Sequence, residues 1–136
     1  MLAIVDTGPL YASLDRDDDD HETCVATLQR QDLQLVIPVL VVAETSYLAG
    51  TRLGPDVEAR FVDALATLDV EAPAPEDWRR ISALVSEYGD FPLGTTDASV
   101  VALAERLDAE VVVTLDTRHF RAVRPRHRDA LRLLPD

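Results

Sequence analysis

Four acidic residues stand where this chain otherwise favours apolar side chains, and their carboxylates could act together: Asp6, Glu44, Asp97 and Asp116. A carboxylate beside a hydrophobic core is costly unless it is paired, protonated or bound to a cation. If the four meet, they repel one another until a cation relieves the repulsion. Ligation by oxygen alone favours Mg²⁺ or Mn²⁺ over zinc. The sequence therefore predicts a metal site, with Asp6, Asp97 and Asp116 as its ligands.

Two of the four acids follow expected strands. Asp6 ends the apolar run 2–5, and Asp116 closely follows the run 111–113, so both stand at the carboxyl end of an expected buried strand. Open α/β sheets place their active sites at that edge. We therefore expect these two carboxylates to lie near each other.

The other two acids are expected on helices. Glu44 interrupts an apolar stretch, and apolar residues lie at helical spacings from it: Leu40, Val41, Tyr47 and Leu48. Its carboxylate is thus expected on or beside an apolar helix face. Asp97 repeats this arrangement ahead of Val100, Val101 and Ala104.

Each acid also has a structural explanation that the sequence leaves open. Asp6 could cap the following helix, Asp97 could favour a helix start, and Asp116 could begin a turn. Glu44 would instead need a buried arginine partner.

Strand-like and helix-like segments alternate along the chain. Strands are expected at 2–5, 35–37, near 70, at 111–113 and near 131–134, and helices near 9–14 and at 21–31, 38–50, 54–68, 76–88 and 95–107. In the helix at 76–88, Trp78 is expected to face inward as a core anchor. With no internal repeat or linker, the pattern predicts one α/β domain over residues 1–136, built on a central parallel sheet of four to five strands.

Composition excludes several classes of protein. All 13 basic residues are arginine, so the chain cannot be a Schiff-base enzyme or carry a nucleotide-binding loop that ends in lysine. The single cysteine, Cys24, cannot form an internal disulfide. No apolar stretch reaches the roughly 18 residues of a membrane helix, and the start of the chain lacks the order of a signal peptide. We therefore expect a cytoplasmic protein without a membrane partner.

Charge is distributed unevenly along the chain, whose formal net charge is −12. Residues 117–132 hold six arginines and one acid, a net of +5, whereas the rest holds seven arginines and 24 acids, a net of −17. We call the six the arginine strip: Arg118, Arg121, Arg124, Arg126, Arg128 and Arg132. Such polarity suits an acidic pocket that holds cations beside a basic strip that guides a polyanion. Pairing with nearby carboxylates on a solvated face is the alternative.

Four short motifs, in their order and spacing, resemble the PIN-domain nucleases and, within them, the VapC-type toxins of toxin–antitoxin systems: Ile4-Val5-Asp6-Thr7, Val42-Ala43-Glu44, Thr96-Asp97-Ala98 and Val113-Thr114-Leu115-Asp116. The resemblance implies a three-layer α/β/α fold. It also implies a metal-dependent endoribonuclease whose acidic pocket consists of Asp6, Glu44, Asp97 and Asp116, and in which Mg²⁺ or Mn²⁺ activates a water for hydrolysis of RNA. By the same resemblance, Thr7 and Thr114 supply hydroxyls that orient carboxylates or water.

The resemblance further implies partners. VapC-type proteins pair as homodimers and are held inactive by a cognate VapB-type antitoxin, whose tail lies across the acidic pocket. Their RNA substrates are transfer or ribosomal RNA. Candidate RNA contacts in this chain are Arg118, His119, Arg121 and Arg124. For His119, an exposed loop histidine without a role is the alternative.

Two other functions remain open at this point. A different magnesium-dependent phosphohydrolase is suggested by Asp6-Thr7 after a strand, but Gly8 stands where a haloacid-dehalogenase-like enzyme needs a second aspartate. A non-catalytic module could bind RNA or a protein through the strip from Arg118 to Arg132, but it leaves the four acids unexplained.

Overall fold

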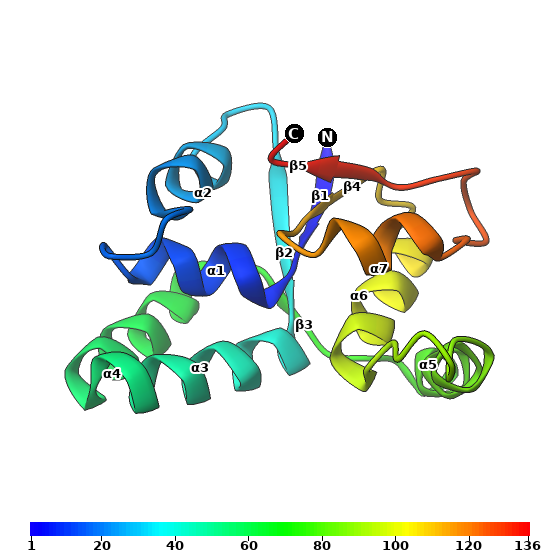
Figure 1. Cartoon of the computed structure of the whole chain (residues 1–136), viewed down its shortest axis with the longest axis horizontal. Helices are drawn as coiled ribbons and strands as arrows, with labels where there is room; N and C mark the ends of the chain where they lie inside the picture. Colours follow the sequence, from blue (N-terminus) through cyan, green and yellow to red (C-terminus); the bar gives the residue numbers. More distant parts are fainter.

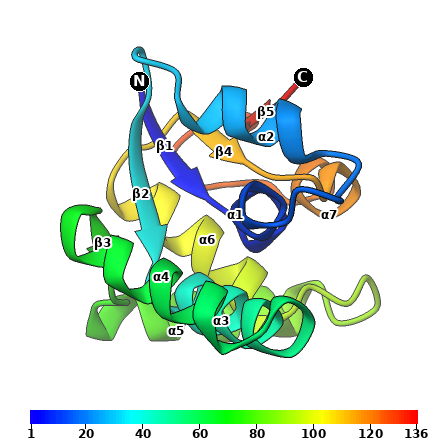
Figure 2. The same ribbon diagram turned by 90° about the vertical axis from the view of Figure 1, so that its left-hand side faces the viewer.

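Five parallel strands form one sheet between helices on both of its sides (Figure 1). The computed structural model describes all residues, 1–136. The strands are β1 (Leu2–Val5), β2 (Gln34–Pro38), β3 (Val70–Glu71), β4 (Val111–Val113) and β5 (Arg132–Leu134). Their order across the sheet is β3-β2-β1-β4-β5. Figure 2 shows β1 and β2 side by side and running in the same direction.

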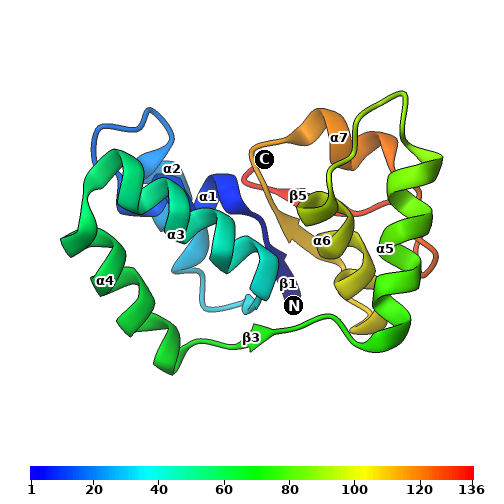
Figure 3. The same ribbon diagram turned by 90° about the horizontal axis from the view of Figure 1, so that it is seen from below.

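Seven α-helices cover the sheet. They are α1 (Thr7–Leu14), α2 (His21–Leu28), α3 (Val39–Leu53), α4 (Pro55–Ala64), α5 (Pro75–Glu87), α6 (Thr95–Arg106) and α7 (Thr117–Ala122), with a short 3-10 turn at Leu65–Thr67. Seen from below, α3 and α4 lie together on one side of the molecule, and α5 and α6 on the other (Figure 3). None of these helices is both long and apolar enough to cross a lipid bilayer.

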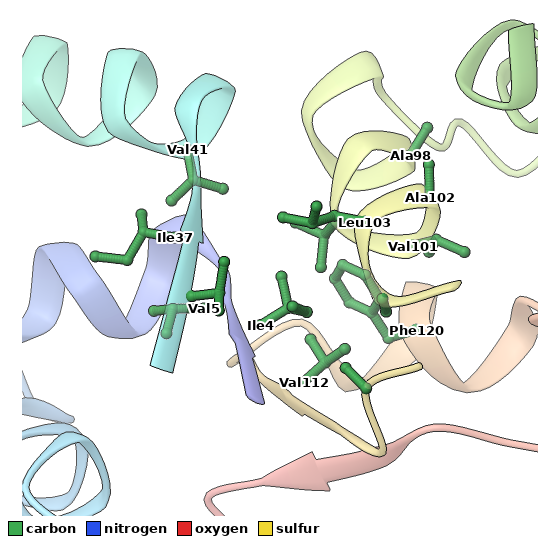
Figure 4. Close-up of a cluster of buried hydrophobic side chains, with 14 of the residues drawn as sticks. Ile4, Val5, Ile37, Val41, Ala98, Val101, Ala102, Leu103, Val112 and Phe120 are labelled. Atoms are coloured by element: carbon green, nitrogen blue, oxygen red, sulfur yellow. The ribbon is translucent and has the colours of Figure 1, made fainter. Parts of the chain in front are cut away.

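The central strands are apolar runs because helices cover both faces of the sheet. On one face, Ile4 and Val112 belong to the main core together with Leu103 of α6 and Phe120 of α7, toward which Ile4 points (Figure 4). On the other face, a smaller cluster packs against Leu28 of α2; it consists of Ala3, Val111, Val113 and Leu134. The core therefore fixes β1 and β4, the two strands that carry Asp6 and Asp116 at their ends.

The strand order reverses between β1 and β4. From β1 the chain moves outward to β2 and β3, then crosses to the other side of β1 for β4 and β5. Val5 pairs with Val113, so the two strands end level with each other. Ligands of open α/β sheets bind beside such a switch point, at the carboxyl ends of the strands.

The predicted parallel α/β sheet is confirmed, with five strands, but details of the helices differ. The helix expected to end near Gly50 continues to Leu53, because the residue that ends it is Gly54, whose φ of 95° suits glycine. The expectation that Trp78 anchors the core is wrong: its exposed fraction is 48%, and α5 buries Asp77, Ile81 and Leu84 instead. The six-residue helix α7 was not predicted.

Candidate active site

The carboxylate of Asp6 lies at the switch point and is almost completely buried, with 5% of the residue exposed. Its backbone N–H donates to the carbonyl of Val113 at 2.9 Å, which carries the pairing of β1 and β4 one residue further. Asp6 is the N-cap residue of α1, yet its side chain makes no capping hydrogen bond. Helix capping therefore does not explain why a carboxylate is buried here.

Thr114 connects Asp6 to Asp116. Its hydroxyl donates to Asp6 Oδ2 at 2.8 Å and accepts the backbone N–H of Asp116 at 2.9 Å. The residue is 1% exposed, and its own N–H donates to the carbonyl of Leu134 at 2.8 Å. A single buried hydroxyl thus joins the ends of β1 and β4 and holds one oxygen of Asp6 in place.

Burial raises the pKa of Asp6 from 3.8 to about 6. The Thr114 hydroxyl and the backbone amide of Thr7 favour the ionised carboxylate and oppose this rise, whereas the negative charges of Asp97 and Glu44 add to it. The ionised form of Asp6 is therefore costly in the protein alone, and a bound cation would stabilise it.

Asp97 lies in the first turn of α6 and is partly buried. Its pKa is raised, first by burial and next by the negative charge of Asp116, with a further contribution from Glu44. His119 and the backbone of Gly94 oppose the rise. The four acids, which come from α3, α6 and the ends of β1 and β4, therefore share one electrostatic neighbourhood, which we call the acidic site.

Glu44 lies at the exposed rim of this site, beside the apolar face of α3 rather than on it. The buried positions of α3 are Val41, Thr45 and Ala49, spaced by four residues, and Glu44 is one position away from that stripe. It therefore needs no buried arginine partner. Its charge still raises the pKa of both Asp6 and Asp97.

Asp116 caps α7 and binds a histidine. Its Oδ1 accepts the backbone N–H of His119 at 3.1 Å, and its Oδ2 lies 2.7 Å from the His119 Nδ1. Asp116 therefore also has a structural role, since its side chain caps the start of a helix. His119 is not an exposed loop residue: it lies within α7, and 21% of its side chain is exposed.

The donor set fits a hard divalent cation that keeps several of its waters. No three Asp, Glu, His or Cys side chains converge closely enough to hold a metal ion among them. Magnesium ions are bound through one or two carboxylates and several waters, so the oxygen donors of Asp6 and Asp97 suffice for such an ion. Beside Asp6, the buried hydroxyl of Thr7 has no hydrogen-bond partner in the chain.

Phe91 is a residue of this neighbourhood that the sequence analysis missed. It lies in the loop between α5 and α6. The centroids of the Phe91 and His119 rings are 4.8 Å apart, and the guanidinium carbon of Arg118 lies 5.0 Å from the centroid of the Phe91 ring. Leu93, which is 3% exposed, anchors the same loop in the core. The signal was present in the sequence as an aromatic residue in a loop flanked by glycines, Gly89 to Gly94.

The candidate RNA contacts lie on α7 and just after it. Arg118, Arg121 and Arg124 are exposed, and none of them forms an ion pair with a carboxylate. A separate pocket of about 420 Å³ lies among α1, α2 and α4, and none of the four acids lines it. Arg118 and Arg121 lie on the helix that Asp116 caps, whereas this pocket lies apart from the four acids.

Comparisons with known proteins identify the family of this chain. The family model described as PIN domain matches residues 3–125. The chain is 34% identical over 124 residues to Ribonuclease VapC26 of Mycobacterium tuberculosis (strain ATCC 25618 / H37Rv), a match covering 90% of this chain and 92% of that protein. Nucleases of this family are in general metal-dependent.

Two solved structures show the same fold. The crystal structure of M. tuberculosis VapC20, a sarcin-ricin loop cleaving toxin, matches with a TM-score of 0.76 at 16% identity and covers 81% of this chain and 86% of that one. VapBC2 of Rickettsia felis, bound to a DNA fragment from its promoter, matches with a TM-score of 0.72 at 17% identity and covers 98% and 97%. The chain belongs to the PIN-domain family, among its VapC-type members.

Proposed function

We propose that this chain is a metal-dependent endoribonuclease toxin of a type II toxin–antitoxin system, with its cleavage site at Asp6, Glu44, Asp97 and Asp116. The observation that carries the proposal is the carboxylate of Asp6, which is buried at the switch point of the sheet and repelled by Asp97 and Glu44. The 34% identity to Ribonuclease VapC26 supports RNA as the substrate.

The residues of the acidic site have distinct tasks in this proposal. Mg²⁺, or Mn²⁺ in its place, would lower the pKa of an attacking water and neutralise charge on the scissile phosphate. Asp6 and Asp97 would hold the ion directly, and Asp116 would act on it through one of its waters. Thr114 keeps Asp6 in one orientation through their hydrogen bond. Glu44 at the exposed rim and the Thr7 hydroxyl orient waters.

The side chains next to the acidic site contact RNA in this proposal. Arg118 and Arg121 lie on the helix that Asp116 caps, and both lack a carboxylate partner, so their guanidinium groups are available to phosphates. His119 is held by Asp116 through Nδ1, which leaves its Nε2 available to the substrate. Arg124 extends this contact surface beyond α7.

The proposal includes a protein partner. The similar R. felis structure is a complex of toxin and antitoxin, and a cognate VapB-type antitoxin is expected for this chain as well. Outside residues 117–132 the chain carries a net charge of −17, which is complementary to a basic inhibitor. The proposal also states that this chain forms a homodimer and that it acts in the cytoplasm, where its RNA substrate is found.

The test is RNA cleavage by purified protein that has been freed of any co-purified partner. Total RNA is incubated with the protein in EDTA, Mg²⁺ or Mn²⁺, beside the Asp97→Ala variant. Asp63→Ala, which removes an exposed aspartate from α4, is the matched control. We expect discrete fragments that require the metal, persist in the control and vanish with Asp97→Ala.

The two rival functions predict other results. Membership of the PIN-domain family removes the haloacid-dehalogenase-like alternative. A non-catalytic binding module would give no cleavage with any metal and RNA binding that Asp97→Ala leaves unchanged. Incubating the protein with single-stranded DNA of the same sequence as a cleaved RNA tests whether the enzyme distinguishes RNA from DNA.

A further inference from the structure

The segment that follows α7 returns along the full length of the sheet. Residues 123–131, here called the return loop, connect α7 at the carboxyl end of β4 to the start of β5, which runs parallel to β4 (Figure 1). The arginine strip follows this path, because Arg118 and Arg121 lie on α7 and Arg124, Arg126 and Arg128 on the loop. Arginines thus occur all along the chain from the helix that Asp116 caps to the start of β5.

The backbone of the return loop is fixed to the rest of the protein. The N–H of Arg124 donates to the Tyr88 hydroxyl at 3.1 Å, and the N–H of Arg126 donates to Glu105 Oε2 at 2.8 Å. The Nε2 of His127 lies 2.6 Å from the carbonyl oxygen of Ala109. The shortest of the contacts that hold the loop are therefore made by its backbone and His127, whereas the one arginine side chain that attaches it, that of Arg128, does so at 3.5 Å or more.

The guanidinium groups of the loop are left without strong carboxylate partners. Arg124 and Arg126 form no ion pair, although the chain has 25 acids for 13 arginines. The acid nearest to Arg126 in this network, Glu105, is already bound by Arg80 at 2.8 and 2.9 Å. Arg128 has a 3.6 Å pair with Asp108, whose side chain is 77% exposed, and a long 3.5 Å hydrogen bond to the carbonyl oxygen of the same residue. Such surface pairs contribute little.

The residues of the loop line an open surface pocket of about 440 Å³ that has no hydrophobic lining residue. It is lined by Arg124, Pro125, Arg126, His127, Arg128 and Asp129. Three arginines outweigh the single aspartate, so the pocket favours an anion. Guanidinium groups bind phosphate oxygens in bidentate fashion, which makes a phosphodiester the matching ligand.

We infer that the return loop is a second binding site for the phosphate backbone of RNA, separate from the cleavage site. The inference rests on the proposed function, in that RNA is the substrate. An RNA strand whose scissile bond lies at the acidic site continues over α7 and places later phosphates against Arg126 and Arg128. The protein therefore prefers RNA long enough to reach both sites over an oligonucleotide that fills the cleavage site alone.

The test compares two double variants that lose the same charge. Arg126→Ala/Arg128→Ala removes two arginines from the return loop, and Arg16→Ala/Arg79→Ala removes two exposed arginines outside the strip. Binding of a fluorescent RNA of about 30 nucleotides and of one of about six is measured across a salt series, both in the Asp97→Ala background. Thermal unfolding of each variant checks that the fold is intact.

We expect the loop variant to bind the long RNA at least tenfold more weakly. The slope of log affinity against log salt should fall by about 1.4, since each phosphate contact on a single strand contributes about 0.7. The affinity of the loop variant for the short RNA should change less than twofold. The affinity of the control variant for either RNA should also change less than twofold. With Asp97 restored, the loop variant should raise KM for the long RNA and leave kcat unchanged.

The outcomes separate this inference from the proposed function. An equal loss for long and short RNA, or the same loss in the control, overturns the second site. If the protein cleaves no RNA but the loop variant still loses affinity for long RNA, the second site stands and the nuclease proposal fails. If cleavage is normal and the loop variant binds long RNA as the unchanged protein does, the nuclease stands and the second site is wrong.

Discussion

The hydroxyl of Thr114 donates a 2.8 Å hydrogen bond to the buried carboxylate of Asp6, and it does so across the point where the strand order reverses. Thr114 is therefore more than a filler of the core. It favours the ionised form of Asp6, which burial disfavours, and it also receives the N–H of Asp116. Both ends of the acidic site depend on this one oxygen atom.

Replacing Thr114 with valine should weaken both activity and stability. The substitution keeps the shape of the side chain but removes the donor to Asp6, so the pKa of Asp6 rises further and the acid limb of the pH–rate profile moves to higher pH. The loss of a buried hydrogen bond should cost about 1–3 kcal/mol in urea unfolding. Thr114→Ser restores the hydroxyl and should restore the profile. A valine profile that superimposes on that of the unchanged protein would show that this bond does not control Asp6.

Asp6 should make the free energy of unfolding depend on pH in the absence of metal. Its pKa is about 6 in the folded protein and 3.8 without the fold, so between these values the folded state holds a proton that the unfolded chain has released. Stability therefore falls as the pH rises through this window, and above pH 6 the full penalty, about 3 kcal/mol, is present.

The Asp6→Asn variant tests this dependence. In EDTA it should be more stable than the unchanged protein by up to about 3 kcal/mol at pH 7 to 8, and the difference should vanish near pH 4. Urea unfolding at several pH values measures it, with Asp63→Asn as the control at an exposed site. Added Mg²⁺ should recover stability only where Asp6 is present. A difference that does not change with pH would contradict the raised pKa.

The sequence predicted the acids at strand ends better than the acid inside a helix. Asp6 and Asp116 follow short apolar runs, and a parallel sheet brings the ends of such runs together. These positions led to the PIN-domain resemblance, and the family, the fold and the nuclease class are confirmed. The sequence could not decide whether Glu44 lies on the apolar face of α3 or beside it, because the apolar residues around it belong to more than one face, as the 69% exposure of Tyr47 shows.

Features that depend on contacts between loops were not predictable in the same way. Helix α7 has six residues, too few for a hydrophobic period, and its start is defined by the cap from Asp116 to His119. The packing of Phe91 on Arg118 and His119 joins segments almost 30 residues apart, so no pattern of neighbouring residues in the sequence predicts it. Trp78 stands three residues before Ile81, as a core residue could, but the buried face of α5 runs through Asp77, Ile81 and Leu84 and leaves Trp78 48% exposed.

Phe91 should matter for RNA binding more than for stability. It contacts both Arg118 and His119, so Phe91→Ala should free these two side chains and raise KM for RNA cleavage several-fold, with little change in thermal unfolding. Trp78→Ala removes another partly exposed aromatic side chain, one that lies on α5, and serves as the control. Equal KM values for the two variants would show that the Phe91 contacts do not position the substrate-binding side chains.

The ion pair of Arg80 and Glu105 should be a structural support of the return loop. Two hydrogen bonds of 2.8 and 2.9 Å join the side chains, which are 12% and 10% exposed, and Glu105 also accepts the N–H of Arg126. Arg80→Met leaves the carboxylate of Glu105 largely buried without its cation and should cost about 3–5 kcal/mol in urea unfolding. In Arg80→Met/Glu105→Gln the uncompensated charge is gone and an oxygen acceptor for Arg126 remains, so much of the stability should return. If the double variant is as unstable as the single one, the loss comes from packing of the arginine side chain rather than from the unpaired charge.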